Sequence, residues 1–529
     1  HMHEALGIDA SVNRMTPDDL ISAILRAPVD LLWNGGIGTY VRATSETDAQ
    51  VGDRANDPVR VTAKEVRAKA AGEGGNLGWT QAGRIEYARN GGRINTDFID
   101  NSAGVDTSDH EVNIKILLDA EVAAGRISEQ ERDELLPAMA DDVASLVLRH
   151  NHSQNLALAN ALSSDGPTAG VLEAWMCELE ESGHLDRAVD TMPSTTEMNR
   201  RMAAGERLAS PELCTLLAWT KIALCDAVLA TDLPEDPFVA DRLVGYFPPL
   251  LRERFVERMP THRLHREIIT TEAVNRFVDS QGIMAYYRLH LQTGADIAQV
   301  IRCQLAVRSV FGLGRVETDL THLGLDAVRT AKIRLALTDL AMHATRWFLN
   351  HGGADDIAGT IETYRPGVAT LVEKLSERLL GDSADAWQEK VDEVTELGLD
   401  RSDAAVVAAY DWSPVLLSIV EISEEGHPLD EVADAYLTLA RRVDMIRLTR
   451  LVEQLPQDRP TDARVRASLR EDLLRVMSDA TRRALVIGTD NVLADGGRIV
   501  KSIAANPDLA HCVVMVSDLR SAVGQDVTL

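Results

Sequence analysis

The chain has 529 residues, of which 82 are acidic and 54 basic, so its formal net charge is −28. Such a length exceeds what one hydrophobic core usually supports, and we expect two or three domains. The negative charge argues against nucleic acid and membranes as partners, because nucleic acids and anionic membranes are bound mainly through lysine and arginine. Aromatic residues make up only 4% of the chain, which favours helices packed through Leu, Ala and Val.

The cysteines and the apolar segments bear on the cellular compartment in which we expect the protein. Five cysteines are dispersed without a C-x-x-C pair, which predicts a reducing, cytoplasmic location and argues against a disulfide framework. No apolar run approaches the ~20 residues that cross a bilayer. His1-Met2 look like the remnant of a cleaved tag, and we therefore expect a fragment of a longer protein.

The first elements alternate helix and strand. Thr16-Pro17 followed by two acids predicts a helix that ends before Pro28. Val29–Trp33 predicts a buried strand, followed by a turn of Asn34, Gly35 and Gly36. This turn is neither a G-x-G-x-x-G nor a Walker sequence, so the residues alone favour a plain tight turn over a ligand loop. The polar stretch Thr39–Arg60 is expected to form an ordered loop near the site.

The stretch Gly72–Leu118 predicts a ligand pocket. An extended segment at Glu65–Ala71 runs into Gly72, Gly74 and Gly75, then Thr80 caps a helix that stops at Gly91-Gly92. A second extended segment, Arg93–Ile99, follows, so the pieces predict a βαβ unit of parallel strands. Ligands of such sheets bind at the carboxyl ends of the strands, where Asn76 and Asn101 fall.

Ser108 has two interpretations. Ser108-Asp-His-Glu111 matches a capping box that opens the next helix, and a helix start is a favourable seat for a carboxylate. The spacing alone gives even odds that Ser108 is only the cap.

Beyond about Gly125 the pattern predicts helix after helix. Capping signals occur at Ser128, Ser194 and Ser210, and one apolar stripe runs from Val465 to Ala484. Turns are expected at five places along this part: Ser163–Thr168, Leu233–Pro237, Tyr246–Pro249, Gly352-Gly353 and Leu455–Pro460.

The histidines of this helical part do not form a recognisable metal set. A helix surface or an interdomain contact is favoured for His262 and Arg266, because no further metal ligands can be identified from the sequence. His150 and His152 are expected to be capping or surface residues.

Two motifs resemble the glutamate dehydrogenase family. Glu73-Gly-Gly-Asn76 is similar to its E-G-A-N turn, and Asn101-Ser-Ala-Gly-Val105-Asp-Thr-Ser108 to its A-N-A-G-G-V-T-V-S segment. The segments WNGGIGTY, VGDRAND and GRINTDFIDNSAGVDTSDHEVNIKILL resemble the large-subunit, NAD-dependent bacterial branch, and the helical remainder is similar too. Asp100, Asp109, His110 and Val112 depart from the shorter enzymes, so no role is carried over to them.

The resemblance implies NAD as cofactor and L-glutamate and 2-oxoglutarate as substrate and product. It implies cofactor-binding roles for one group of residues, Asn34, Gly35, Gly36, Gly75 and Asn76, and substrate-binding roles for another, Asn101, Val105 and Ser108. Ser108 would bind the side-chain carboxylate of the substrate. We assign no catalytic residue and no metal ligand.

The resemblance also indicates what the chain lacks. The family's lysines, its catalytic aspartate and the G-x-G-x-x-G turn find no match, so we expect the fragment alone to be inactive. The predicted fold is mainly α, with a partial α/β Rossmann-like nucleotide domain followed by a large all-helical domain. The expected divisions are 3–125, 126–330 and 331–529. A homo-oligomer is expected; the alternative function is a non-catalytic helical assembly or regulatory module.

Overall fold

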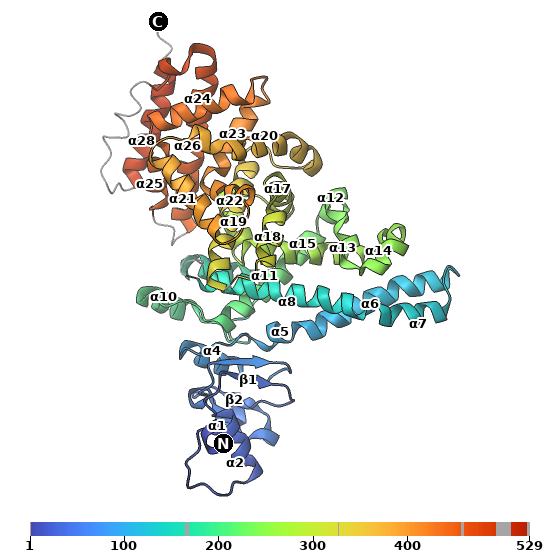
Figure 1. Cartoon of the computed structure of the whole chain (residues 1–529). Helices are drawn as coiled ribbons and strands as arrows, with labels where there is room; N and C mark the ends of the chain where they lie inside the picture. Colours follow the sequence, from blue (N-terminus) through green and yellow to red (C-terminus); the bar gives the residue numbers. More distant parts are fainter. Residues whose placement is uncertain (1, 164–168, 326, 456–459, 494–508, 526–529) are drawn as a thin grey trace. The chain divides into compact units, whose positions relative to one another are not determined.

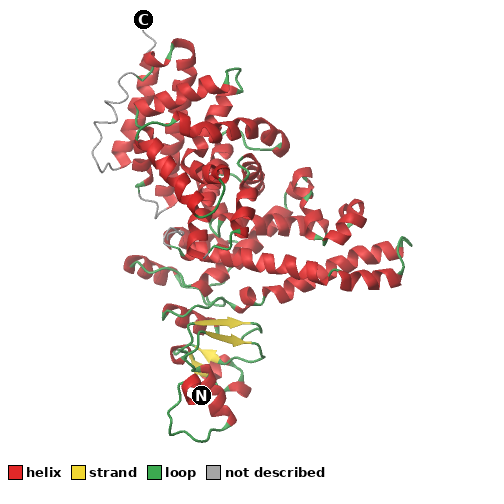
Figure 2. Ribbon diagram, viewed as in Figure 1, coloured by secondary structure: helices red, strands yellow, loops and turns green. Residues whose placement is uncertain are grey.

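The computed structural model describes residues 2–163, 169–325, 327–455, 460–493 and 509–525 (Figure 1). His1 and most of the turns expected at Ser163–Thr168 and Leu455–Pro460 lie outside these residues. The chain divides into two compact units, His1–Ile283 and Met284–Leu529. Helices dominate the fold, as predicted, and the strands are few and short (Figure 2). The functional divisions at 125 and 330 stay predictions.

The N-terminal part of the first unit is built on two small parallel sheets. β1 (Leu31–Asn34) pairs with β4 (Ala70–Glu73), and β2 (Val41–Arg42) pairs with β3 (Val61–Thr62). The short helix α1 (Met2–Leu6) and α2 (Pro17–Leu25) precede them, and Thr16 caps α2 through a capping box as predicted. Both sheets contribute to one apolar core, whose most buried members include Val41, Val61, Trp79 and Tyr87.

The predicted βαβ unit is confirmed in its first half only. Thr80 caps α4 (Gln81–Arg89), which ends just before Gly91. The expected strand Arg93–Ile99 is wrong: a single bridge joins Arg93 to Ala70, and α5 (Asp97–Asp100) follows. Polar side chains explain the difference, because Asn95 and Asp97 bond to other segments rather than lying between strands. Within the described residues each sheet has two strands.

The loop between β1 and β4 is ordered around Arg60, whose side chain is fully buried. Its guanidinium group donates to the carbonyl oxygen of Thr39 at 2.8 Å and to Asp48 at 3.1 Å. Three short helical segments break up the loop: α3 (Asp48–Val51), η1 (Arg54–Asn56) and η2 (Ala63–Glu65). An arginine that binds several parts of one segment holds its irregular portions together.

A helical hairpin follows the sheets. α6 (Ser102–Ala123) and α8 (Ala140–Leu162) pack against each other, with α7 (Glu129–Ala138) between them in the chain (Figure 1). Leu117 is buried and Ile116 half-buried. Ser128 caps α7 as predicted.

The remaining helices of the first unit surround α11 and α15. Ser194 caps α10 as predicted, whereas α11 begins at Ser210 itself. His262 precedes α15 and is buried, so a helix-surface position is wrong for it. Its Nε2 lies 3.1 Å from the carbonyl oxygen of Asn113, a residue on the other side of the expected division at 125. The bounds are α9 (Ala169–Glu181), α10 (Thr195–Ala204), α11 (Ser210–Leu229), η3 (Leu233–Glu235), α12 (Pro237–Ala240), α13 (Arg242–Tyr246), α14 (Pro249–Phe255), η4 (Val256–Thr261) and α15 (His265–Gln281).

The second unit is a helical assembly with its own core. Trp347, Phe348 and Tyr436 are among its most buried side chains. The predicted apolar stripe lies on α26, where Leu469, Leu473, Val476, Ala480 and Ala484 are buried. The bounds are α16 (Ala285–Thr293), α17 (Ile297–Val310), α18 (Leu313–His322), α19 (Ala327–Asn350), α20 (Ile357–Arg378), α21 (Asp382–Glu396), α22 (Arg401–Ala408), η5 (Ala409–Trp412), α23 (Ser413–Ser423), α24 (Leu429–Arg442), α25 (Met445–Glu453), α26 (Pro460–Ile487), η6 (Thr489–Asn491) and α28 (Leu509–Gln525).

One apolar segment corrects the prediction that no apolar run approaches the length needed to cross a bilayer. Arg401–Ser423 is long and apolar enough to cross a membrane by length and composition, with a mean hydropathy of 1.5. It is 67% buried inside the second unit and is divided by η5. An apolar helix surrounded by other helices is typical of a protein core, and we interpret α22–α23 in this way.

Candidate functional site

The two glycine turns meet at the carboxyl ends of β1 and β4. Asn34 is the last residue of β1, and its carbonyl oxygen accepts hydrogen bonds from the N–H groups of Gly74 at 2.8 Å and Gly75 at 3.3 Å. A Cβ atom on Gly75 would lie 2.8 Å from the carbonyl oxygen of Gly36. The turns therefore pack backbone to backbone, which explains the glycine at position 75. Gly35 and Gly36 are exposed beside them.

Three asparagines surround these turns. The side-chain amide of Asn101 donates to the side-chain oxygen of Asn76. Asn34 Oδ1 accepts from the N–H of Gly36 at 3.2 Å, while the buried Asn34 Nδ2 has no hydrogen-bond partner in the described part of the chain. The structure thus brings together residues that are far apart in the sequence, as the prediction of a site at the strand ends requires.

A buried ion pair lies beneath the second turn, and no pattern in the sequence predicted it. Glu73 and Arg84 join through Glu73 Oε2 and Arg84 Nε at 2.6 Å, with side chains 0% and 5% exposed. Glu73 Oε1 also accepts the N–H of Trp79 at 3.0 Å, so the carboxylate closes the turn. Burial raises the pKa of Glu73 although Arg84 opposes the rise. The signal in the sequence is only an acid and an arginine 11 positions apart.

The middle of this turn is strained. Leu77 has a φ of 60°, which non-glycine residues rarely adopt. Asp97 Oδ2 accepts the N–H of Leu77 at 2.8 Å, and Thr39 Oγ1 donates to its carbonyl oxygen at 2.7 Å. Strained backbone persists where neighbouring groups fix it, and it clusters at functional sites. The conformation of Asn76, next to Leu77, is therefore set by groups on two other segments.

The predicted substrate residues lie on α6, but Ser108 is not its cap. The helix begins at Ser102, so Ser108 is inside it, and its hydroxyl donates to the carbonyl oxygen of Gly104 at 3.3 Å. The capping-box interpretation of Ser108 is wrong, because Asn101 already stands at the N-cap position seven residues earlier. Val105 is 62% exposed, and Ser108 is exposed as well. The first turn of α6 closes on Asn101, whose carbonyl oxygen accepts the N–H of Gly104 at 2.8 Å.

Another cluster of polar side chains joins the hairpin helices on a different side of α6. Asp106 and His110 come from α6 and His150 from α8, and their ligand atoms lie within 4.8 Å of one another. Burial lowers the pKa of His110 to about 4, so its imidazole is neutral. Burial opposes a charge on His150 as well, but its hydrogen bond to Asp106 and the nearby charges of Glu272 and Asp106 together outweigh burial and raise its pKa. His150 is therefore not the capping or surface residue expected.

Comparison with known proteins identifies the family of the chain. Residues 1–161 match the family model of the bacterial NAD-glutamate dehydrogenase catalytic domain, and residues 205–527 match that of the glutamate dehydrogenase C-terminal region. The chain belongs to the bacterial NAD-glutamate dehydrogenase family, because the second match alone covers more than half of it. The catalytic-domain match includes the β1 and β4 turns and the α6–α8 hairpin.

Individual relatives are named NAD-specific glutamate dehydrogenases. The chain is 41% identical over 489 residues to the NAD-specific glutamate dehydrogenase of Mycobacterium tuberculosis, covering 91% of this chain and 30% of the relative. It is 38% identical over 533 residues to that of Pseudomonas aeruginosa, covering 98% of this chain and 32% of the relative. The chain thus spans about a third of the length of the curated relatives it matches.

Proposed function

We propose that the chain supplies one wall of the active site of an NAD-dependent glutamate dehydrogenase. The reaction is the oxidative deamination of L-glutamate to 2-oxoglutarate and ammonia, with hydride transfer to NAD. The observation that carries the proposal is the convergence of the Asn34–Gly36 turn, the Gly75-Asn76 turn and Asn101 at the ends of two parallel strands. Ligands of parallel sheets bind at these ends.

The residues present fit part of an NAD site. Exposed backbone at Gly35 and Gly36 and the amide groups of Asn76 and Asn101 offer donors and acceptors to a ribose or a carboxamide. NAD supplies the hydride acceptor when bound. The chain's own residues orient the cofactor and the substrate, with Val105 and Ser108 facing outward from α6. The strands and turns correspond to part of a Rossmann-like nucleotide domain.

The proposal assigns no proton transfer to this chain. Its 529 residues contain no G-x-G-x-x-G turn. Among the described residues of the wall, we assign no side chain as a general base next to the exposed turns. We therefore expect turnover only from a protein of the relatives' length, in which further segments complete the site.

Ser108→Ala in such a protein tests the substrate side. A lost hydrogen bond to a charged group costs about 1.5–3 kcal/mol, so the KM for glutamate is expected to rise roughly tenfold or more. Because Ser108 lies inside α6, alanine is expected to leave the melting temperature unchanged or slightly higher. Steady-state rates of NADH formation over a range of glutamate concentrations measure the effect.

Thr107→Ala is the matched control for this substitution. Thr107 is the exposed neighbour on the same helix, and its hydroxyl donates to the carbonyl oxygen of Ala103 at 2.6 Å. The control should keep the wild-type KM. An unchanged KM for glutamate in Ser108→Ala would show that Ser108 does not bind the substrate.

A further inference from the structure

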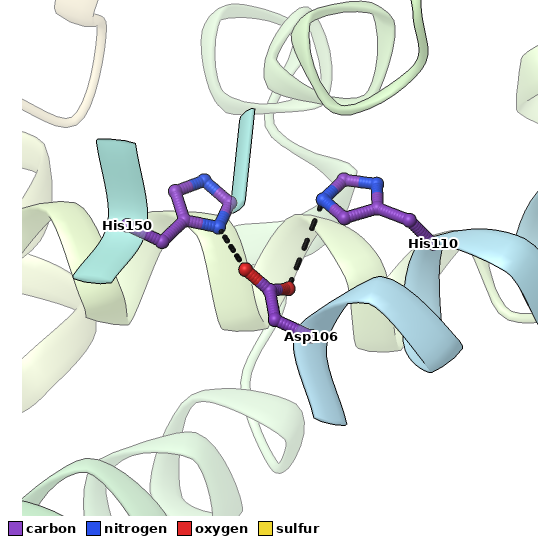
Figure 3. Close-up of side chains that lie close together, drawn as sticks. All are labelled: Asp106, His110 and His150. Carbon is purple, nitrogen blue, oxygen red and sulfur yellow. Dashed lines mark hydrogen bonds and ion pairs between the residues drawn. The ribbon is translucent and has the colours of Figure 1, made fainter. Parts of the chain in front are cut away.

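Three side chains between α6 and α8 have the chemistry and the spacing of a metal site. Asp106 Oδ2 lies 2.8 Å from His150 Nδ1, and Asp106 Oδ1 lies 3.7 Å from His110 Nε2. Figure 3 shows the carboxylate between the two imidazole rings, with one oxygen directed to each. Asp106 and His110 are four residues apart on one helix, which places both on the same face.

His110 is the unusual member of this cluster. Its side chain is 0% exposed, and within the described residues neither ring nitrogen has a hydrogen-bond partner. The ring of Tyr246 stacks on it with centroids 4.2 Å apart, so the imidazole is held by apolar contact on one face. Burying a polar group without a hydrogen-bond partner destabilises the folded state. A ligand on Nε2 would remove part of this destabilisation.

We propose that Asp106, His110 and His150 bind a divalent cation of the zinc class and thereby fix α6 to α8. Two imidazole nitrogens and one carboxylate oxygen are a common ligand set for such ions, with a fourth position left for water. Metal–ligand bonds of about 2.0–2.1 Å place the ligand atoms of a tetrahedral site roughly 3.3 Å apart. The two distances from Asp106 to the histidines bracket this value, and all three ligand atoms lie within 4.8 Å of one another. Side-chain rotations would therefore bring them onto one ion.

The surroundings of His150 also suit a metal ligand. With Nδ1 facing Asp106, its other nitrogen Nε2 lies 3.7 Å from Glu272 Oε1 on α15. A ligating histidine usually directs its second ring N–H to a carboxylate, which fixes the orientation of the ring and strengthens the bond to the metal. Glu272 would have this positioning role.

The cation would act on the helix that carries the substrate candidates. Ser102, at the start of α6, is already bonded to α8, because its hydroxyl oxygen accepts from Asn151 Nδ2 at 2.8 Å and from Gln154 Nε2 at 2.9 Å. The ion would add a second link about one turn further along α6. It would hold the segment with Val105 and Ser108 in place without contacting the substrate.

Zinc binding to the 529-residue chain tests the inference without any turnover. The chain is first freed of metal with a chelator and then titrated with ZnCl2 by calorimetry. We expect one ion per chain with a dissociation constant in the micromolar range or below, and a rise in melting temperature on saturation. Co²⁺ bound in its place should show the strong visible absorption of a four-coordinate site. His110→Phe keeps the ring stacked on Tyr246 and should weaken binding by more than ~100-fold, and Glu272→Gln by about 10-fold.

His152→Phe is the matched control. His152 is exposed on the same helix, two residues from His150, and its loss should leave zinc affinity unchanged. Asp106→Asn gives an independent test if His110→Phe does not fold, and it should also abolish the zinc-induced rise in melting temperature. The inference is overturned if the wild-type chain does not bind zinc stoichiometrically. In that case the cluster is only a hydrogen bond between Asp106 and His150. It is equally overturned if both ligand variants bind zinc like the wild type.

Discussion

Arg84→Ala is expected to lower the free energy of unfolding of the first unit by about 3–5 kcal/mol. Removing one partner of a buried ion pair leaves the other charge buried without compensation, which accounts for a loss of this size. Glu73 would remain with a side chain 0% exposed and with only neutral donors around its carboxylate in the turn. Urea unfolding of the 529-residue chain, followed through the transition of the first unit, measures the loss.

Arg89→Ala provides the comparison on the same helix. Arg89 pairs with Glu206, and both side chains are about one third exposed. An exposed ion pair contributes about 0–1 kcal/mol, so this variant should unfold nearly like the wild type. Equal losses in the two variants would show that the Glu73–Arg84 pair does not support the turn. A large loss in Arg84→Ala alone would confirm that it does.

The second large effect is a dependence of stability on pH in the second unit. His351 on α19 lies between two carboxylates, with Nδ1 2.9 Å from Glu421 and Nε2 3.2 Å from Glu471. Burial opposes its charge, but the two carboxylates outweigh burial and raise its pKa to about 9. Trp347 stacks on its ring at 4.1 Å and limits its motion.

The sign of the effect follows from the raised pKa. The folded state holds the proton more tightly than the unfolded chain, whose histidine titrates near its ordinary value of about 6.5. The stabilisation is fully present below about pH 6.5 and is lost as the pH rises through about 9. From the size of the shift it amounts to at most about 3 kcal/mol.

His351→Gln should therefore destabilise the second unit at pH 6 and make little difference at pH 10. Urea unfolding of the wild type and the variant at several pH values gives the difference between their free energies of unfolding. The contributions of all other titrating groups cancel in this difference. His322→Gln, at an exposed histidine on α18, should show no such pH-dependent difference. A constant difference between wild type and His351→Gln from pH 6 to pH 10 would contradict the assignment.

Local signals in the sequence predicted local structure well. Thr16, Thr80 and Ser128 cap helices where their spacing predicted caps, since an N-cap depends only on the next three residues. The strand predicted at Arg93–Ile99 failed because Asn95 and Asp97 bond to residues that the local pattern does not contain. The prediction that Ser108 caps a helix failed for a related reason, because the helix already begins at Ser102 and includes Ser108.

A family resemblance added long-range information that local signals lack. Asn76 and Asn101 meet although 25 residues separate them, and the resemblance implied a cofactor-binding role for Asn76 and a substrate-binding role for Asn101. Asp106 and His150 are 44 residues apart, and neither pattern nor resemblance linked them. Their contact depends on how α8 packs against α6, which is a tertiary property. The expected homo-oligomer and the cytoplasmic location stay predictions.

Gly75→Ala, in a protein of the relatives' length, tests the central claim most directly. An added methyl group would lie 2.8 Å from the carbonyl oxygen of Gly36 and would push the two turns apart. Gly245→Ala is the control, because a Cβ there meets nothing within 4 Å. If the paired turns form the cofactor wall, kcat/KM for NAD should fall about tenfold or more in Gly75→Ala and stay unchanged in Gly245→Ala. A wild-type kcat/KM in folded Gly75→Ala would contradict the account.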